Sequence, residues 1–512
     1  MNDSIAESRA QLRRNVYTLL IALSTAVVLG RVLAVDSIDK IALENYRVKK
    51  VDERLDRERT KLQRAGVRGE ALERRLAQIA EKDDLWGWAR LRRPFLSGND
   101  RSRWCTVRAL VEDDLRVEGH PYAIDRVIQE PGWDTIDMVK HDGHLYSSKP
   151  PLFPTMMAAE YWLIHRLTGM TLETHPYVVG RFMLVTVNLL PLLVYFWLLA
   201  RLIERFGTTD WGRLLVMAAA AFGTYLTTFA VVINNHLPAA ISAAVALYAA
   251  VRIWFDDERR WRYFVVAGFF AAFAAANELP ALTLFGALSL ALLWKAPSRT
   301  MLGYLPAVLV VGGAFFATNW IAHEDLKPPY LHRSETNPDD NWYRYEYQRN
   351  GKTHRSYWEN PAGVDRGEPS PLVYAAHIVV GHHGVFSLTP VWLLSAAGTV
   401  IWLCRRRDPQ LRQLALLIGG VTAVCLAFYL TRGQHHRNYG GVTSGFRWMF
   451  WFSPLWLAVM LPAADAMAGR RWTRGIALVL LVLSVLSASY PTWNPWVHPW
   501  LMDYLHYLGW GG

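Results

Sequence analysis

Long apolar runs separated by short charged segments dominate this sequence. The first run extends from Val16 to Val35, which is about the length that crosses a bilayer, and Arg9, Arg13 and Arg14 precede it. Further apolar runs cover residues 152–167, 178–202, 214–233, 237–255, 263–276, 279–294, 301–321, 386–404, 414–430, 448–467 and 476–489. The pattern predicts an all-α polytopic membrane protein with 11 or 12 transmembrane helices and a long first outer loop.

Composition and charge refine this prediction. Hydrophobic residues make up 52% of the chain, which excludes an ordinary soluble multidomain protein. The net charge of +11 indicates topology rather than nucleic-acid binding, because the basic residues cluster at the ends of apolar runs. The clusters are Arg201/Arg205/Arg213, Arg252/Arg259/Arg260/Arg262, Lys295/Arg299, Arg405/Arg406/Arg407 and Arg470/Arg471/Arg474.

Basic clusters mark cytoplasmic loops, so we expect a multi-pass protein with a cytoplasmic N-terminus. The segments expected outside are those around Asn234 and Glu278, residues 323–371, residues 434–447 and the C-terminal tail. Runs 152–167 and 178–202 would then both begin outside. Either the first of them is an interfacial or re-entrant helix, or the charge rule fails once.

The apolar pattern divides the chain into seven regions. Residues 39–93 are rich in charge and have apolar positions at helical spacing on both sides of Gly66 and Gly69, which predicts a helical hairpin or coiled coil. We interpret it as a solvated spacer or a docking site for a protein partner. The expected regions are 1–36 (first transmembrane helix), 37–95 (charged hairpin), 96–151 (outer loop with catalytic-type motif), 152–322 (transmembrane bundle), 323–384 (outer loop), 385–490 (transmembrane bundle) and 491–512 (outer tail).

Two motifs in the long first loop suggest a family. One is Asn99-Asp-Arg-Ser-Arg-Trp104, and the other is Asp142-Gly-His-Leu-Tyr-Ser-Ser-Lys-Pro-Pro-Leu152. Together they resemble the GT-C membrane glycosyltransferases, especially bacterial aminoarabinose-transferase-like and protein-mannosyltransferase-like members. The resemblance implies transfer of a sugar from a polyprenyl-phosphate donor to a lipid, glycan or protein acceptor. It also implies a cell-envelope enzyme in the bacterial inner (cytoplasmic) membrane that works at the outer face.

Asp100 is the first candidate catalytic residue. Sugar transfer from a phosphate-linked donor needs a base for the acceptor hydroxyl, or a carboxylate that holds a divalent cation such as Mg²⁺ or Mn²⁺. In the family pattern Asp100 matches the essential aspartate and Arg103 the arginine. Arg101 stands where the family often has a second acid, which weakens two-carboxylate metal binding. Alternatively, Asn99 or Asp100 simply caps the helix that follows.

Lys149 is the candidate phosphate ligand, since two prolines fix the backbone after it and the family carries a phosphate-contacting lysine here. Tyr146, three residues earlier, belongs to the same motif. The alternative for Lys149 is a snorkelling lysine at the membrane interface.

Four further candidates lie at the expected outer ends of later runs. Asn235 and His236 are polar groups at membrane depth, and Glu278 is a possible second carboxylate. Each could instead belong to a solvated cap or turn. Arg447 closes a glycine-rich segment resembling a family signature, and we expect it to contact phosphate. The neighbouring His pairs lack the spacing of a zinc site.

Other functional classes have less support. Walker, Rossmann, Gly-x-Ser-x-Gly and His-Glu-x-x-His motifs are missing from the sequence. A transporter or lipid flippase would also have polar residues at membrane depth, but it would be expected to show internal repeats. A noncatalytic GT-C scaffold that docks partners through residues 39–93 is the third possibility. The aromatic residues of segment 323–371 fit either sugar contact or an interfacial belt.

Overall fold

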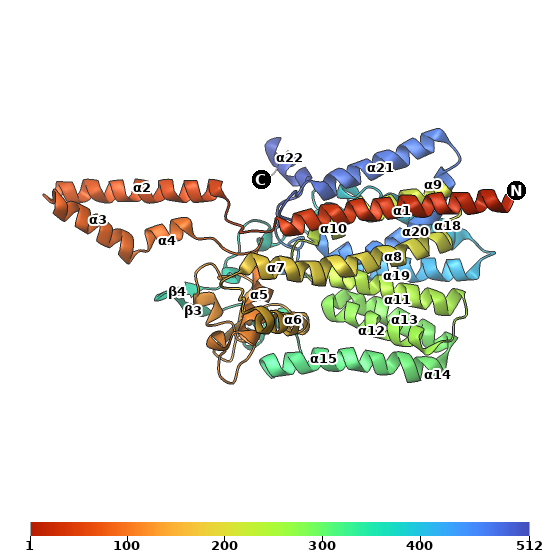
Figure 1. The fold of residues 1–512 in the computed structure, drawn as a ribbon, viewed down its shortest axis with the longest axis horizontal. Helices are drawn as coiled ribbons and strands as arrows, with labels where there is room; N and C mark the ends of the chain where they lie inside the picture. The colour runs from red at the N-terminus through yellow and green to blue at the C-terminus, as the bar shows by residue number, and fades with distance from the viewer. Residues whose placement is uncertain (1, 511–512) are drawn as a thin grey trace.

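The computed structural model describes residues 2–510, and most of these residues are helical. Long helices run side by side along one axis and form a bundle (Figure 1). The bundle helices are α1 (Asn2–Leu33), α7 (Pro176–Leu184), α8 (Leu190–Phe206), α9 (Asp210–Phe222), α10 (Tyr225–Phe229), α11 (His236–Phe255), α12 (Trp261–Asn277), α13 (Leu282–Lys295), α14 (Pro297–Arg299), α15 (Leu305–His323), α18 (Trp392–Cys404), α19 (Pro409–Leu430), α20 (Ser453–Met467) and α21 (Arg471–Ser489).

Within the described part of the chain, eight helical segments are long and apolar enough to cross a membrane. They are Glu7–Leu33, Pro176–Phe206, Asp210–Phe229, His236–Phe255, Pro297–His323, Pro409–Leu430, Arg447–Met467 and Arg471–Ser489. Leu279–Lys295 and Trp392–Cys404 are shorter apolar helices, and α12 lies against α11. The expected helical, polytopic fold class is therefore confirmed.

The charged loops between the helices gather at the end of the bundle where α1 begins (Figure 1). Arg13 of α1 forms ion pairs with Glu204 at 2.6 Å and Asp210 at 2.5 Å, and Arg205 pairs with Asp256 at 2.6 Å. These contacts join α1, α8, α9 and the end of α11. The basic clusters thus share one end of the bundle, as the charge pattern requires.

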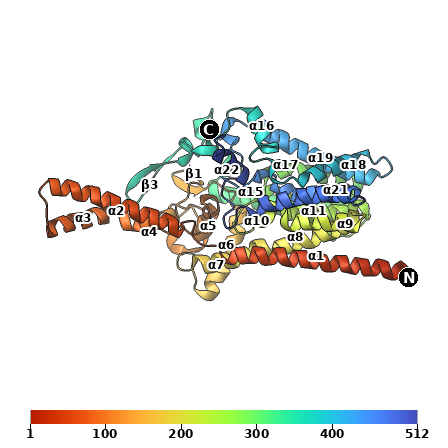
Figure 2. The same ribbon diagram turned by 90° about the horizontal axis from the view of Figure 1, so that it is seen from above.

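The opposite end of the bundle carries the smaller elements and the C-terminal helix (Figures 1 and 2). They are α5 (Gly98–Val111), α6 (Leu152–Thr168), α16 (Pro371–Val379), α17 (Val385–Leu388), α22 (Trp500–Tyr507), and the antiparallel hairpins β1 (Met138–His141) with β2 (His144–Ser147) and β3 (Glu346–Arg349) with β4 (Lys352–Arg355). α6 lies across the bundle axis and is seen nearly end-on in Figure 1. This orientation favours the interfacial alternative for residues 152–167.

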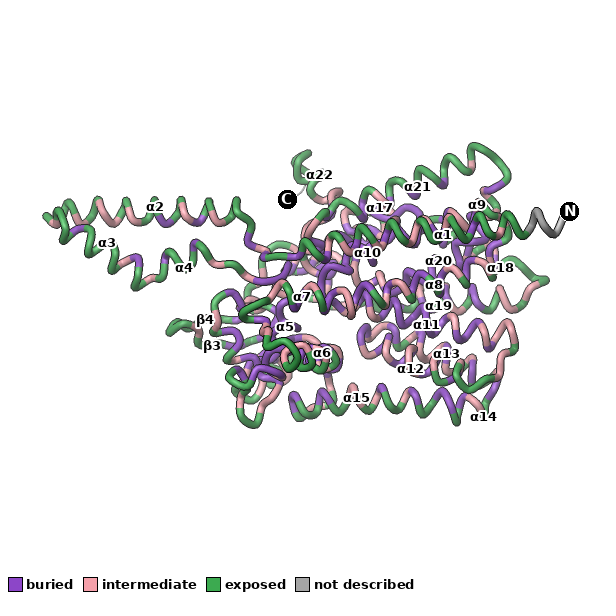
Figure 3. Tube along the Cα trace, in the orientation of Figure 1, coloured by how far each residue is buried: buried purple, intermediate pink, exposed green. Residues whose placement is uncertain are grey.

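Helices α2 (Ile41–Arg64), α3 (Glu70–Lys82) and α4 (Leu85–Arg90) project away from this end of the molecule and are largely exposed (Figure 3). The buried carboxylate of Asp39 holds their base, pairing with Arg47 at 2.6 Å and Arg93 at 2.7 Å. Because α3 has only 13 residues and α4 completes the returning arm, this is a short helical hairpin. The structure gives no support for the expected coiled coil in this segment.

The arrangement predicts the sidedness of the chain. A reporter fused after residue 340 should read as outside the membrane, and one fused after residue 257 as inside, because these positions lie at opposite ends of the bundle. Accessibility of the fused reporters in intact cells would measure this. Reversed readings would place the loops around α5 in the cytoplasm and contradict the orientation.

Candidate functional site

A cavity of about 580 Å³ lies where α5, the β1–β2 hairpin and the ends of several bundle helices meet. Six of the residues expected at the site line it, and they come from five separate parts of the chain. These residues are Arg103, Lys149, Asn235, His236, Glu278 and Arg447. The fold therefore brings together side chains that are as much as 344 residues apart, from Arg103 to Arg447.

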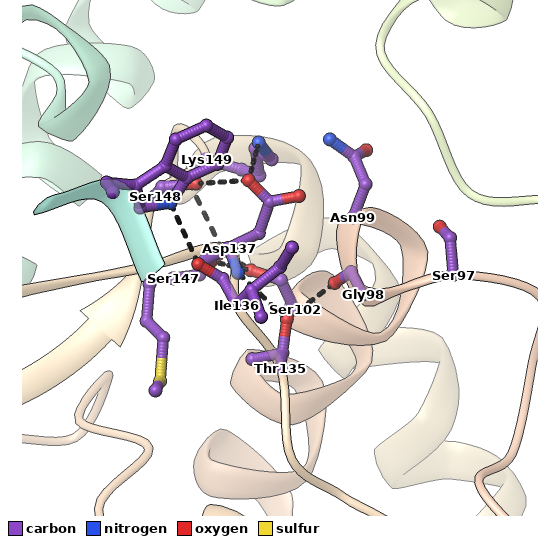
Figure 4. Close-up of polar contacts among 12 residues, drawn as sticks. Ser97, Gly98, Asn99, Ser102, Thr135, Ile136, Asp137, Ser147, Ser148 and Lys149 are labelled. Atoms are coloured by element: carbon purple, nitrogen blue, oxygen red, sulfur yellow. Dashed lines mark hydrogen bonds and ion pairs between the residues drawn. The ribbon is translucent and has the colours of Figure 1, made fainter. Parts of the chain in front are cut away.

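Lys149 faces a carboxylate that we did not predict from the sequence, that of Asp137. Lys149 Nζ donates to Asp137 Oδ1 at 2.9 Å, and Ser148 Oγ lies 3.4 Å from the same oxygen (Figure 4). The other carboxylate oxygen, Oδ2, accepts no hydrogen bond from the described residues. The cavity thus contains a lysine and a carboxylate with one oxygen left for a ligand.

The local backbone explains why Asp137 and Lys149 meet. Asp137 immediately precedes β1 and Lys149 follows β2, so the antiparallel pairing of Met138 with Ser147 brings the two ends of the hairpin together. Asp142 and Gly143, with φ of 49° and 83°, form the tight turn. Ser102 on α5 donates to the Asp137 carbonyl oxygen at 2.6 Å and fixes the hairpin against that helix.

The electrostatics of this pair follow from burial and from neighbouring charges. Burial acts to raise the pKa of the Asp137 carboxyl, but Lys149, Arg447 and Arg103 together hold this pKa below its usual value. Burial lowers the pKa of Lys149 to about 8, although Asp137 favours its charged form. Asp137 is therefore an anion at neutral pH and Lys149 is close to its titration point.

A second constellation holds Arg447 at the cavity wall. Arg447 Nη1 donates to His236 Nε2 at 2.7 Å, and His236 Nδ1 lies 2.5 Å from Glu278 Oε1. Since arginine can only donate, Nε2 must carry the lone pair and Nδ1 the proton, and Glu278 lies beside this nitrogen. His236, with Glu278 beside it, thus helps to orient the Arg447 side chain.

The glycine-rich segment before Arg447 completes its support. Gly440 has a φ of +95°, and a Cβ there would lie 3.0 Å from the Arg447 side chain. The Gly440 carbonyl oxygen accepts from Arg447 Nε at 2.6 Å, and the guanidinium lies over Trp496. Two of the three guanidinium nitrogens are thereby held, which leaves Nη2 for a ligand.

Arg103 links the first turn of α5 to the segment before α11 through hydrogen bonds. Its Nη1 donates to the backbone oxygen of Asn99 at 2.9 Å and to Asn99 Oδ1 at 2.8 Å, while Nη2 donates to Asn235 Oδ1. Burial lowers the pKa of Arg103 to about 10. Arg103 therefore adds positive charge to the cavity but is largely engaged by amide and carbonyl oxygens.

Asp100 lies behind this wall and is not part of the cavity lining. Its Oδ1 accepts from the backbone N–H of Ile233 and from Trp104 Nε1, both at 3.0 Å. Burial raises the pKa of Asp100 to about 6, although the Ile233 N–H favours the charged form. Asp100 Oδ1 thus joins α5 to the segment before α11, and the expected reacting or metal-binding role of this carboxylate stays a prediction.

The other residues of the two motifs also differ from expectation. The N-cap of α5 is Ser97, which accepts from the Asp100 N–H at 3.0 Å, so neither Asn99 nor Asp100 is the cap. Tyr146 lies outside the cavity, where its hydroxyl is 3.0 Å from His120 Nδ1 and its ring packs against His323. Tyr146 supports the β1–β2 hairpin instead of facing a ligand.

The position of Asp100 leads to a prediction. Asp100→Asn should keep activity within about threefold, because the amide oxygen can still accept both hydrogen bonds. Asp100→Ala should destabilise the protein by roughly 1–3 kcal/mol for each buried N–H left without an acceptor. Thermal unfolding and transfer assays of both variants measure this. A hundredfold loss of turnover in a folded Asp100→Asn variant would return the catalytic role to Asp100.

The described residues do not fit the divalent cation that the sequence suggested. Among them, no three His, Cys, Asp or Glu side chains form a ligand set for a metal ion. Hard cations need several oxygen ligands, whereas Asp137 pairs with Lys149 and Glu278 faces His236. The described residues therefore give no support for a metal ion at this site, with or without Asp100 as a ligand.

Sequence reasoning missed several cavity residues besides Asp137. Asp365, in the 3₁₀ turn Gly363–Arg366, accepts from Tyr357 Oη at 3.0 Å and from Asn438 Nδ2 at 3.2 Å, and burial raises its pKa. Arg333 and Arg432 line the same cavity. Asp137 could have been found as the acid just before the strand that leads to Lys149, but Asp365 belongs to no recognisable motif.

The fold and the site together define a multi-pass membrane protein with a charged cavity at one end of its helices. No protein-family model and no curated protein sequence matches the chain. Among solved structures, the chain resembles the oligosaccharyltransferase of Archaeoglobus fulgidus in three states.

In complex with zinc and sulfate, that protein aligns with a TM-score of 0.36 and 13% identity over 80% of this chain. The apo form gives a TM-score of 0.39 and 11% identity over 81%. The complex of this enzyme, AglB, with an inhibitory peptide and a dolichol-phosphate aligns with a TM-score of 0.35 and 12% identity over 83% of this chain. The chain spans 55%, 54% and 58% of the chains in these three structures, little more than half their length.

Proposed function

We propose that this protein is a GT-C membrane glycosyltransferase that moves a sugar from a polyprenyl-phosphate donor to an acceptor at the outer face of a bacterial inner membrane. The observation that carries the proposal is the pairing of Asp137 with Lys149 beside Arg447 in one cavity at the end of the membrane helices. Sugar transfer from a lipid phosphate needs a base and a cluster of cations, and this cavity contains both.

The cations suit the donor phosphate. Lys149 offers a compact ammonium group, and Arg447 offers Nη2 from a guanidinium whose other nitrogens are already held. Such a preorganised pair stabilises the charge that collects on the phosphate as the sugar departs. Arg103 contributes positive potential from the wall behind them.

Asp137 suits the acceptor. In the proposed step, the acceptor oxygen forms a bond to the anomeric carbon, and the bond from that carbon to the phosphate oxygen breaks, leaving its electron pair on the phosphate. The acceptor proton moves to Asp137 Oδ2. A bound phosphate partly neutralises the cations that depress the pKa of Asp137, so donor binding makes this carboxylate a stronger base.

The apolar part of the cavity suits a lipid-linked molecule. Leu279, Pro280, Phe428 and Trp448 line it, and Phe428 is 38% exposed on the outside of α19. The phosphate could thus meet Lys149 while its polyprenyl chain stays in the membrane.

The proposal is tested by measuring sugar transfer by the purified protein in nanodiscs. The protein is given labelled polyprenyl-phosphate hexoses and pentoses, with a membrane extract as the source of acceptor, and released polyprenyl phosphate is measured. We expect release from at least one lipid donor, together with labelled product. A nucleotide sugar is the control and should not be consumed. Failure of every lipid donor to lose its sugar would contradict the proposal.

A further inference from the structure

A second group of basic side chains lines the same cavity. Arg333 follows the 3₁₀ turn Pro329–Leu331, Arg432 follows α19, and His436 ends the 3₁₀ turn Gln434–His436. All three line the cavity and are half-buried. They come from the long outer loop and from the segment after α19, which the glycosyl-transfer step above does not use.

Aromatic rings hold these guanidinium groups in place. Arg333 lies over the rings of Tyr343 at 4.9 Å and Trp358 at 4.8 Å, and Arg432 lies over Phe428 at 5.1 Å. Stacking fixes the plane of a guanidinium without neutralising its charge or using its N–H donors. The donors therefore remain available to a ligand.

The described residues provide no ion-pair partner for the two arginines of this group. Within residues 2–510, neither Arg333 nor Arg432 forms an ion pair or a side-chain hydrogen bond. Glu335 carries a carboxylate in the same outer loop, but this residue is exposed and its carboxylate lies 3.6 Å from His435 Nε2. By contrast, Lys149 has Asp137, and Arg447 lies beside the His236–Glu278 pair.

The neighbouring positive charges also act on the pKa of His436. Burial lowers its pKa to about 3, and Arg432, Arg333 and His435 add to this effect. His436 is thus a neutral hydrogen-bonding group in the neighbourhood of two charged ones. Like charges held together in a partly buried site favour an anion that binds between them.

We propose that Arg333, Arg432 and His436 bind a phosphate group on the acceptor. This assignment rests on the proposed function, in which Lys149 and Arg447 take the phosphate of the donor. Two groups of basic side chains in one cavity suit a reaction between two phosphorylated molecules. Because Arg432 comes two residues after the end of α19, the phosphate could belong to a lipid headgroup or to a soluble phosphorylated acceptor.

Binding measurements separate these two sources. In the soluble arm, glycerol 3-phosphate is titrated into the protein in phosphatidylcholine nanodiscs and tryptophan fluorescence is followed. In the lipid arm, phosphatidylcholine is replaced stepwise by phosphatidylglycerol. Saturable binding in the soluble arm identifies a free phosphate ligand, and a response in the lipid arm alone identifies a headgroup. Either result supports the site.

The variants are R333Q, R432Q and their double combination, with R344Q as the matched control, since Arg344 is an exposed residue of the same outer loop. The double variant should bind the phosphate probe at least about tenfold more weakly, while R344Q should be unchanged. R333K with R432K keeps the charge and should recover part of the affinity. A folded double variant that binds like the wild type would overturn the assignment.

Donor binding is measured in parallel with fluorescent polyprenyl phosphate. It should stay within about threefold in the double variant, because Lys149 and Arg447 are intact. An equal loss of donor and probe binding would assign the group to the donor and overturn the acceptor site. If the wild type binds the phosphate probe at Arg333 and Arg432 but never cleaves a lipid-linked sugar, the proposed function fails while the anion site stands.

Discussion

Asp137→Asn is expected to lower the rate of sugar transfer by about 100-fold or more while donor binding changes little. Asparagine keeps an oxygen near Lys149 Nζ, but it cannot accept the proton of the acceptor hydroxyl, and loss of a general base typically costs 100-fold to 10,000-fold. Single-turnover rates with saturating lipid donor measure this effect separately from binding.

Two matched variants sharpen this result. Asp100→Asn removes a nearby carboxylate that does not line the cavity, and this variant should keep its transfer activity. Asp365→Asn removes the other newly found cavity carboxylate, which already accepts from Tyr357 and Asn438. Normal turnover by Asp137→Asn together with a large loss in Asp365→Asn would transfer the role of the base to Asp365.

Lys149→Ala is expected to weaken binding of polyprenyl phosphate by about 30-fold to 100-fold, the scale of one charge-assisted hydrogen bond. The phosphate charge is present in the ground state and in the transition state, so turnover should fall as well. Lys149→Arg keeps the charge and should keep most of the affinity. Equilibrium binding of fluorescent polyprenyl phosphate gives both values.

The pH dependence of donor binding follows from the same residue. Burial lowers the pKa of Lys149 to about 8, so the ammonium is charged below that pH and loses its proton above it. Affinity for the donor should therefore fall as the pH rises through 8, by up to tenfold per pH unit. This fall should be absent in Lys149→Arg. A wild-type affinity that is flat from pH 7 to pH 9.5 would show that Lys149 does not contact the phosphate.

The sequence was informative where a single local property decided the outcome. Apolar run length and arginine clusters predicted the bundle and the end at which its charged loops meet, because membrane thickness and charge bias act on each segment separately. The prolines after Lys149 and the glycines before Arg447 likewise marked rigid backbone beside charged side chains. Six of the expected site residues consequently line one cavity.

The direction of a side chain was not predictable in the same way. Asp100 occupies the motif position of a catalytic acid. Its carboxylate nevertheless accepts a hydrogen bond from the Ile233 N–H, more than a hundred residues away, and does not line the cavity. Asp137 has no motif, yet strand pairing places it opposite Lys149. Arg333 and Arg432 meet only through the folding of two distant outer segments. In each case the decisive contact is between residues far apart in the sequence.

The most direct measurement is the structure of the protein with bound polyprenyl phosphate, determined by cryo-electron microscopy in nanodiscs. We expect the phosphate oxygens to lie about 3 Å from Lys149 Nζ and Arg447 Nη2, with Asp137 Oδ2 facing the space that the sugar would occupy. Binding of the phosphate at another surface, with Lys149 and Arg447 left in contact with protein alone, would contradict this expectation.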